Sequence, residues 1–163
     1  MTQRFPITPA GLQKLKDELK QLISVERLQI SREIEIARAH GDLKENAEYH
    51  AAKEKQSHIE GRILELNHVL AHAEVIDVSQ IQLEDRVVFG TTVELLDLEN
   101  NRKLNYRLVG EAEADLKKRW ISISSPVGKQ LIGKKVGEEV SVHTPSGIRE
   151  YQILSVVIQD EGE

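Results

Sequence analysis

The sequence predicts an α+β protein in which an antiparallel α-helical hairpin is followed by a β-sheet domain. Two observations support this fold class. Up to about Val78, apolar residues recur at spacings of three and four, and glycine is rare. The rest of the chain holds seven of the ten glycines and shows alternating β-branched residues. We therefore expect two domains, residues 1–78 and residues 79–163.

The first helix is expected to start at Thr8-Pro9, because threonine can cap a helix and proline suits its first position. Its apolar stripe changes register once, which predicts a heptad seam with a stutter. The stripe consists of Leu12, Leu15, Leu19 and Leu22, then Ile23, Ile30, Ile34 and Ala37. His40-Gly41 is expected to end this helix, because glycine is preferred just past a helix C-terminus.

The second helix is expected to open at Asp42. Its apolar stripe is clearest at Ile59, Ile63, Leu66, Leu70 and Ala73. The connection at Gly41-Asp42 is too short for anything but a reversal of the chain. The two stripes should therefore bury each other in an antiparallel coiled-coil hairpin with a polar tip.

The second half of the chain reads as a compact sheet domain. Strands are predicted at residues 86–93, 94–98, 103–109, 120–124, 138–144 and 148–158, with a short helix at 127–132. Turns are predicted at Asn100-Asn101 and at Pro145-Ser146-Gly147.

Composition excludes several classes of protein. Cysteine is absent, which rules out disulfides and thiol catalysis. The net charge of -5 argues against duplex binding driven by bulk charge. No apolar run approaches the roughly 18 residues of a membrane span, and residues 1–9 lack the basic and apolar blocks of a signal peptide. We expect a cytoplasmic protein without a membrane partner.

The predicted tip concentrates carboxylates: Asp42, Glu45 and Glu48 fall within about two helical turns. Hard oxygen ligands of this kind suit Mg²⁺. Asp42 and Glu45 also have the spacing of a capping box, and one carboxylate could serve both roles. Two carboxylates are too few to hold Mg²⁺ tightly, so a partner would have to supply the remaining ligands.

Other charged residues leave alternatives open. Arg38 and Lys53 should lie close together near the tip, as a solvated pair or as a small phosphate-contacting patch. His68 and His72 have the spacing of a metal-binding pair, but a solvated pair fits better because no third ligand is evident. The triplet 117–119 reads more naturally as a solvated basic loop than as a nucleic-acid site. The chain contains no G-x-S-x-G elbow and no glycine-rich phosphate loop.

The tip sequence ARAHGDLKENAEYHAAKE, residues Ala37 to Glu54, closely resembles the hairpin tip of the Gre transcript-cleavage factor family. Further segments resemble the same family in the same order: TPAGLQKLKDEL, EGRILEL, VVFG, YRLVG, ISISSPVGKQLIGKKVGE and TPSG. The resemblance covers essentially the whole chain. It implies that the second domain is FKBP-like and binds RNA polymerase.

The resemblance also implies a function. Such factors bind backtracked bacterial RNA polymerase, insert the hairpin into its secondary channel and stimulate the polymerase's own cleavage of the nascent RNA. Asp42 and Glu45 match the two acids that the family brings to the polymerase active site, where they would share Mg²⁺. Arg38 and Lys53 match its basic patch, which contacts the RNA 3′ end. The chain would thus have no cofactor in isolation and would not itself be an enzyme.

The division of labour between the domains can also be predicted. A thin polar hairpin offers little apolar surface, so the second domain should supply most of the affinity for polymerase. The turn Ser124-Ser125-Pro126 is the candidate docking edge, and we expect a monomer. Two rival functions are a channel-binding inhibitor of the same shape and an FKBP-like prolyl isomerase or chaperone. Intact Asp42 and Glu45 argue against the inhibitor, and the scarcity of aromatic residues argues against the isomerase.

Overall fold

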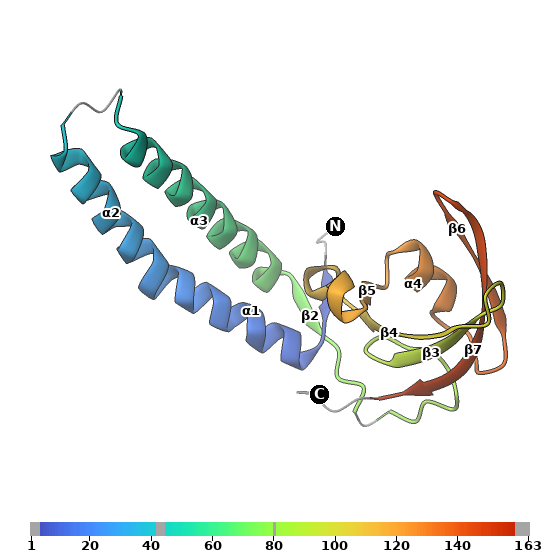
Figure 1. Cartoon of the computed structure of the whole chain (residues 1–163). Helices are drawn as coiled ribbons and strands as arrows, with labels where there is room; N and C mark the ends of the chain where they lie inside the picture. The colour runs from blue at the N-terminus through green and yellow to red at the C-terminus, as the bar shows by residue number, and fades with distance from the viewer. Residues whose placement is uncertain (1–3, 42–44, 80, 159–163) are drawn as a thin grey trace. The chain divides into compact units, whose positions relative to one another are not determined.

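The computed structural model describes residues 4–41, 45–79 and 81–158. The chain packs into two compact units (Figure 1). One is helical and runs from Leu12 to His72, and the other joins the residues up to Gly11 to those from Ala73 onward. Packing therefore groups the N-terminal segment with the second half of the chain. The domain boundary after residue 78 stays a prediction.

The first long helix is built from three consecutive helical segments. They are α1 (Pro9–Gln21), the π-helical turn η1 (Leu22–Glu26) and α2 (Arg27–Ala39). The predicted start is confirmed, because the backbone N–H of Gly11 donates to Thr8 Oγ1 at 3.0 Å. The predicted end is confirmed as well: His40 caps α2, and Gly41 has a φ of +115° that favours glycine.

The π-helical turn lies where the apolar stripe slips. Leu22 and Ile30 are both buried although they are one residue further apart than a heptad. A π turn takes up one extra residue, so both side chains stay on the seam. Ile23, which was assigned to the stripe, is instead 40% exposed. That assignment was wrong because Leu22 is the last seam residue before the register change, and the seam resumes at Ile30 after the π turn.

The second long helix, α3 (Ala47–Ala71), buries Ala52, Ile59, Ile63 and Leu66 against the first. Two bidentate ion pairs clamp the helices together. Arg27 bonds to Glu60, and Arg62 bonds to Glu18, with nitrogen–oxygen distances of 2.8–2.9 Å. The predicted antiparallel hairpin is thus confirmed (Figure 1). In the part of the chain that the structure describes, no helix is long and apolar enough to cross a membrane.

The second unit contains a five-stranded mixed sheet in the order β5-β4-β3-β7-β6. Its strands are β3 (Thr92–Asp97), β4 (Lys103–Val109), β5 (Trp120–Ser122), β6 (Glu139–Thr144) and β7 (Gly147–Val157). Only the β4–β5 pair is parallel. The sheet curls around the short helix α4 (Pro126–Leu131), as Figure 1 shows. The predicted α+β fold class is therefore confirmed.

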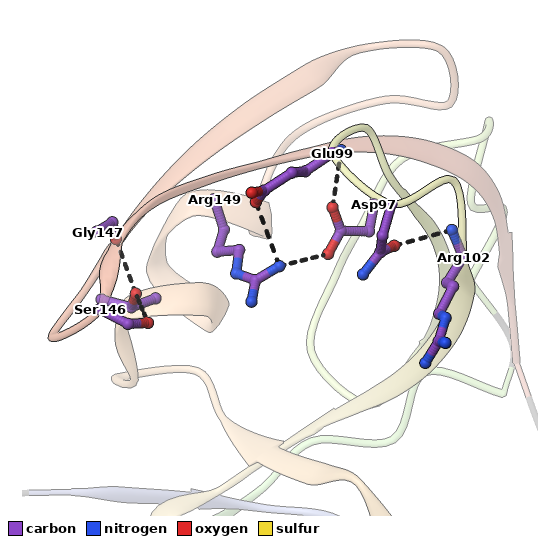
Figure 2. Close-up of polar contacts among 8 residues, drawn as sticks. Asp97, Glu99, Arg102, Ser146, Gly147 and Arg149 are labelled. Atoms are coloured by element: carbon purple, nitrogen blue, oxygen red, sulfur yellow. Dashed lines mark hydrogen bonds and ion pairs between the residues drawn. The ribbon is translucent and has the colours of Figure 1, made fainter.

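The loop ends of two hairpins are held together by a buried carboxylate. Asp97 is 4% exposed and receives a hydrogen bond from the backbone of Glu99. Arg149 of β7 reaches both acids, at 3.2 Å from Asp97 and 3.4 Å from Glu99 (Figure 2). The predicted turn at Asn100-Asn101 follows, with Asn101 at a φ of +62°. The arginine thus links β7 to the β3–β4 turn.

One predicted strand, residues 86–93, was mostly wrong. Arg86 makes an isolated bridge to Lys135, and the continuous strand begins only at Thr92. Gly90 has a φ of +86°, and Thr91 donates to the carbonyl of Val88, so the chain turns there. The apolar residues of this segment are explained by burial in the core, since Val87 is fully buried.

The sheet unit also contains a two-stranded sheet, formed by the segments that flank the hairpin in the sequence. Strand β1 (Phe5–Ile7) pairs in parallel with β2 (Ala73–Val75). The Glu113 carboxylate, from the 3₁₀ turn η2 (Glu111–Glu113), accepts hydrogen bonds from the backbone and the hydroxyl of Thr8 and from the backbone of Gly110. The first turn of α1 is thereby anchored in the sheet unit.

Candidate functional site at the hairpin tip

A single amide side chain closes the tip of the hairpin. Asn46 is the N-cap of α3 and accepts a hydrogen bond from the backbone of Tyr49 at 3.0 Å. Its side-chain Nδ2 donates to the carbonyl oxygen of Ala37 at 2.6 Å. Ala37 belongs to the last turn of α2, and its carbonyl oxygen also accepts from the backbone of His40 at 3.2 Å. Asn46 therefore caps α3, adds a second hydrogen bond to the Ala37 carbonyl and joins the two helix ends.

Of the two predicted tip acids, the structure describes only Glu45. Asp42 lies outside the described residues. Glu45 is exposed in the turn directly before Asn46. The expectation that Asp42 opens the second helix was wrong, because α3 begins at Ala47 and Asn46 takes the cap position. Asp42 and Glu45 therefore do not form a capping box for α3, because the N-cap of this helix is Asn46.

Arg38 and Lys53 lie on one face of the hairpin. Each follows a buried seam residue, Ala37 on α2 and Ala52 on α3, and both alanines line one cavity. In an α-helix, each residue is rotated by about 100° about the helix axis relative to the residue before it. Because α2 and α3 run antiparallel, the residues that directly follow the two seam alanines lie on the same side of the hairpin. Both side chains are exposed, and Lys53 donates to Gln56 at 3.1 Å.

Two shallow cavities flank the tip. The first, of about 420 Å³, is lined by His40, Glu45, Asn46, Ala47 and Glu48. The second, of about 400 Å³, is lined mainly by apolar atoms of Ile36, Ala37, Ala51 and Ala52, with Glu33, Glu48 and Lys55. Glu48 lines both cavities, so a second carboxylate lies next to Glu45. Within residues 4–41, 45–79 and 81–158, no group of three or more metal-ligating side chains occurs.

The histidine pair lies at the opposite end of α3. The ring centroids of His68 and His72 are 4.6 Å apart, and His72 Nδ1 lies 2.9 Å from the carbonyl oxygen of His68. One ring nitrogen of His72 is thus occupied by the backbone. This geometry supports the interpretation of a local pair over that of a metal site.

The candidate docking turn is well ordered by its own hydroxyls. Ser125 caps α4 by accepting from the backbone of Gly128 at 3.1 Å, and it donates to the carbonyl of Ser122 at 2.6 Å. Ser124 and Pro126 are exposed on either side of it. The turn therefore presents Ser124 and Pro126 outward on a rigid base.

Two family models match the chain in tandem. Residues 5–75 match the N-terminal model of transcription elongation factors, and residues 82–157 match the C-terminal model of GreA/GreB transcription elongation factors. The chain belongs to the GreA/GreB family. The transcription elongation factor GreA of Anaeromyxobacter sp. (strain K) is 58% identical over 98% of this chain and 95% of its own.

A second GreA relative agrees with this assignment. GreA of Thermodesulfovibrio yellowstonii is 54% identical over 96% of this chain and 98% of its own length. Among solved structures, GreA factor homolog 1 of Thermus thermophilus is 27% identical, covers 94% of this chain and 99% of that one, and gives a TM-score of 0.44.

Membership of the GreA/GreB family confirms the predicted function in its main terms. The chain is a transcription elongation factor whose partner is RNA polymerase, and it stimulates transcript cleavage by the polymerase without being an enzyme itself. The prolyl isomerase suggested by the second domain is thereby disfavoured.

Sequence reasoning missed two residues of this GreA/GreB factor that organise the structure. Asn46 was passed over, although asparagine is among the preferred N-caps and could have been recognised as a competitor to Asp42. The contact of Glu113 with Thr8 could not be predicted, because the two residues lie 105 residues apart in the sequence.

Proposed function

We propose that the factor acts on backtracked RNA polymerase by inserting its hairpin tip into the secondary channel. Asp42 and Glu45 would there reach the polymerase active site and support cleavage of the nascent RNA 3′ end. The observation that carries this proposal is the exposed Glu45 carboxylate directly beside the Asn46 clamp. Because Asn46 links the two helix ends, the tip can present the Glu45 carboxylate to solvent, where it could bind a metal ion held by the polymerase.

The carboxylates at the tip fit a shared Mg²⁺ ion. Glu45 and Glu48 line an open cavity, and carboxylate oxygens are the ligands that Mg²⁺ prefers. Asp42 and Glu45 would complete the shell of an ion that the polymerase holds only loosely. Such an ion, when bound, activates water or stabilises the leaving oxygen of RNA. The role of this chain is limited to binding the ion and orienting the water that attacks the RNA.

Arg38 and Lys53 would contact the extruded RNA 3′ end. They are exposed on one face near the tip, and their positive charges complement phosphate. Lysine binds phosphate as a point charge, whereas arginine can bind it with two parallel hydrogen bonds. Lys53 should therefore hold RNA by a single contact.

The sheet domain, predicted as residues 79–163, would supply most of the affinity for polymerase, with Ser124, Ser125 and Pro126 at the docking edge. The turn is rigid and partly exposed, as a docking element requires. We propose that the factor works as a monomer in the cytoplasm, where bacterial RNA polymerase acts.

The test is RNA shortening by a stalled elongation complex with the variants Asp42→Asn and Glu45→Gln. Both changes keep the shape of the side chain and remove its charge. We expect cleavage to fall by orders of magnitude while the melting temperature and the affinity for polymerase persist. Raising the Mg²⁺ concentration should partly restore cleavage, because mass action compensates for lost affinity. Glu35→Gln, an exposed site on α2, is the matched control and should cleave as wild type.

Wild-type cleavage by both tip variants would show that the acids are not catalytic. A wild-type protein that slows the polymerase without shortening RNA would instead be the channel-binding inhibitor.

A further inference from the structure

Arg107 is a buried arginine that has no counterion among the residues that the structure describes. It lies on β4, is 8% exposed, and its Nε has no hydrogen-bond partner. Within the described residues, its guanidinium forms no ion pair or hydrogen bond. Arg149 of the same sheet, by contrast, is paired with Asp97 and Glu99 (Figure 2). The sheet therefore contains one satisfied arginine and one unsatisfied arginine.

The stabilisation that Arg107 does receive is incomplete. Its guanidinium carbon lies 5.1 Å from the centroid of the Trp120 ring, which is a cation–π contact. This contact leaves the buried Nε–H of Arg107 without an acceptor in the described part of the chain. A buried donor without an acceptor costs free energy, and a carboxylate that accepts from the guanidinium would remove this cost.

The surroundings of Arg107 are basic and partly apolar. Lys118 Nζ lies 4.8 Å from the same Trp120 ring. The 3₁₀ turn η3 (Leu116–Lys118) is held beside Arg107, because the backbone N–H of Arg107 donates to the carbonyl of Arg119 at 3.0 Å. Leu116 is 83% exposed on this turn. The nearby acid Asp115 already accepts from the backbone of Lys117.

We propose that Arg107, Leu116, Lys118 and Trp120, here called the Arg107 site, bind an acidic side chain on the surface of RNA polymerase. This inference rests on the proposed docking of the sheet domain. The carboxylate would accept from the Arg107 guanidinium and lie near Lys118, and an apolar neighbour would cover Leu116. Arginine and tryptophan are the residues that most often anchor protein interfaces. The same segment continues through β5 into the Ser124–Pro126 turn, so one edge of the sheet would dock.

A protein partner fits better than a nucleic acid. The Trp120 ring already has two cations within about 5 Å, and these compete with a nucleic-acid base for contact with the ring. The net charge of the chain is -5, which opposes binding to a phosphate backbone. Leu116 is 83% exposed on η3, the turn that precedes Arg119, and it adds apolar surface to the charged residues, as in a protein interface.

The test is competition binding of the full chain to RNA polymerase, with the variants Leu116→Asp, Lys118→Glu and Arg107→Gln. Leu116 and Lys118 are exposed, so their variants should keep the wild-type melting temperature even if Arg107→Gln does not fold. We expect roughly tenfold weaker binding for each exposed variant. Lys118→Glu should also lessen the salt dependence of binding. Lys14→Glu on α1 carries the same charge reversal and should bind as wild type.

Wild-type affinity and salt dependence in both exposed variants would overturn the Arg107 site, even if wild-type protein still shortens RNA. Removal of residues 159–163, which contain three acids, should leave both binding and the melting temperature unchanged. If that truncation instead lowers the melting temperature of the wild type but not of Arg107→Gln, the chain's own tail is the anion and the proposal is wrong. Retention of RNA, rather than polymerase, by the Arg107 site would overturn it as well.

Discussion

At the residue scale, the tip depends on an amide that both accepts and donates. Asn46 uses its oxygen to cap α3 and its nitrogen to bind the end of α2. Serine or aspartate could cap the helix equally well but could not donate to Ala37 in the same way. The identity of this residue is therefore set by two helices at once.

We predict that Asn46→Ala lowers the stability of the hairpin by about 1–2 kcal/mol, because it removes the cap and the link to Ala37 together. Asn46→Asp keeps the cap acceptor and loses the donor, so it should fall between wild type and alanine. Thermal unfolding followed by circular dichroism measures both. Asn67→Ala, at an exposed position of α3, is the control. Equal stability of wild type and Asn46→Ala would show that the hydrogen bonds of Asn46 to Ala37 and Tyr49 do not stabilise the hairpin.

The ion pair of Arg27 with Glu60 predicts a dependence of hairpin stability on pH. Hydrogen bonds from Arg27 lower the pKa of Glu60 below its ordinary value. A carboxyl with a lowered folded-state pKa adds stability above its unfolded pKa of about 4.3, and loses it as the pH falls through the folded pKa. Glu60→Gln should therefore melt below wild type at pH 7, and the difference should shrink on acidification. A constant difference between pH 7 and pH 3 would contradict this.

At the element scale, the π turn explains how an irregular sequence forms a regular seam. Leu22 and Ile30 are buried on the same side only because η1 takes up one residue. Without it, eight residues of ideal α-helix would rotate Ile30 away from the seam by roughly 80°. The helix therefore stays continuous while its register shifts.

We predict that deletion of Ser24, inside the π turn, is tolerated, since it restores a heptad between Leu22 and Ile30. Deletion of Ser31 in the regular helix α2 should disrupt the hairpin, because Ile34 and Ala37 would rotate off the seam by about 100°. Both serines are exposed and donate to the carbonyl four residues earlier. Melting temperature and helical content distinguish the variants. Equal damage from both deletions would refute the role of the π turn.

At the scale of the whole molecule, the N-terminal segment is packed into the sheet unit. Gly110 lies so close to the backbone of Pro6 that a Cβ atom would collide with the Pro6 carbonyl oxygen. Glu113 holds Thr8 in the same region. The segment before the first helix is thus part of the fold of the second half.

We predict that Gly110→Ala destabilises the protein by about 1–3 kcal/mol, because two backbones must separate. Gly61→Ala is the matched control: Gly61 lies within α3 with open space at its Cβ position, so alanine should raise helix stability by up to about 1 kcal/mol. Denaturant unfolding of both variants gives the comparison. If Gly110→Ala were neutral, the contact of β1 with the sheet unit would not contribute to stability.

Features that depend on neighbouring residues could be predicted from the amino-acid sequence. The 3–4 periodicity, the cap at Thr8 and the glycine after His40 specified the hairpin, and strand β4 was found at its predicted bounds. The tip run around Glu45 indicated the family, because that motif is contiguous in the chain.

Features that join distant residues could not be predicted from the amino-acid sequence. The register at Leu22, the clamp from Asn46 to Ala37 and the pairing of β1 with β2 required the helices and strands to be assembled. The anchor at Glu113 and the missing partner of Arg107 also became visible only in the folded chain. Periodicity and capping act over a few residues, whereas a hydrogen bond across 105 residues depends on how the whole unit packs.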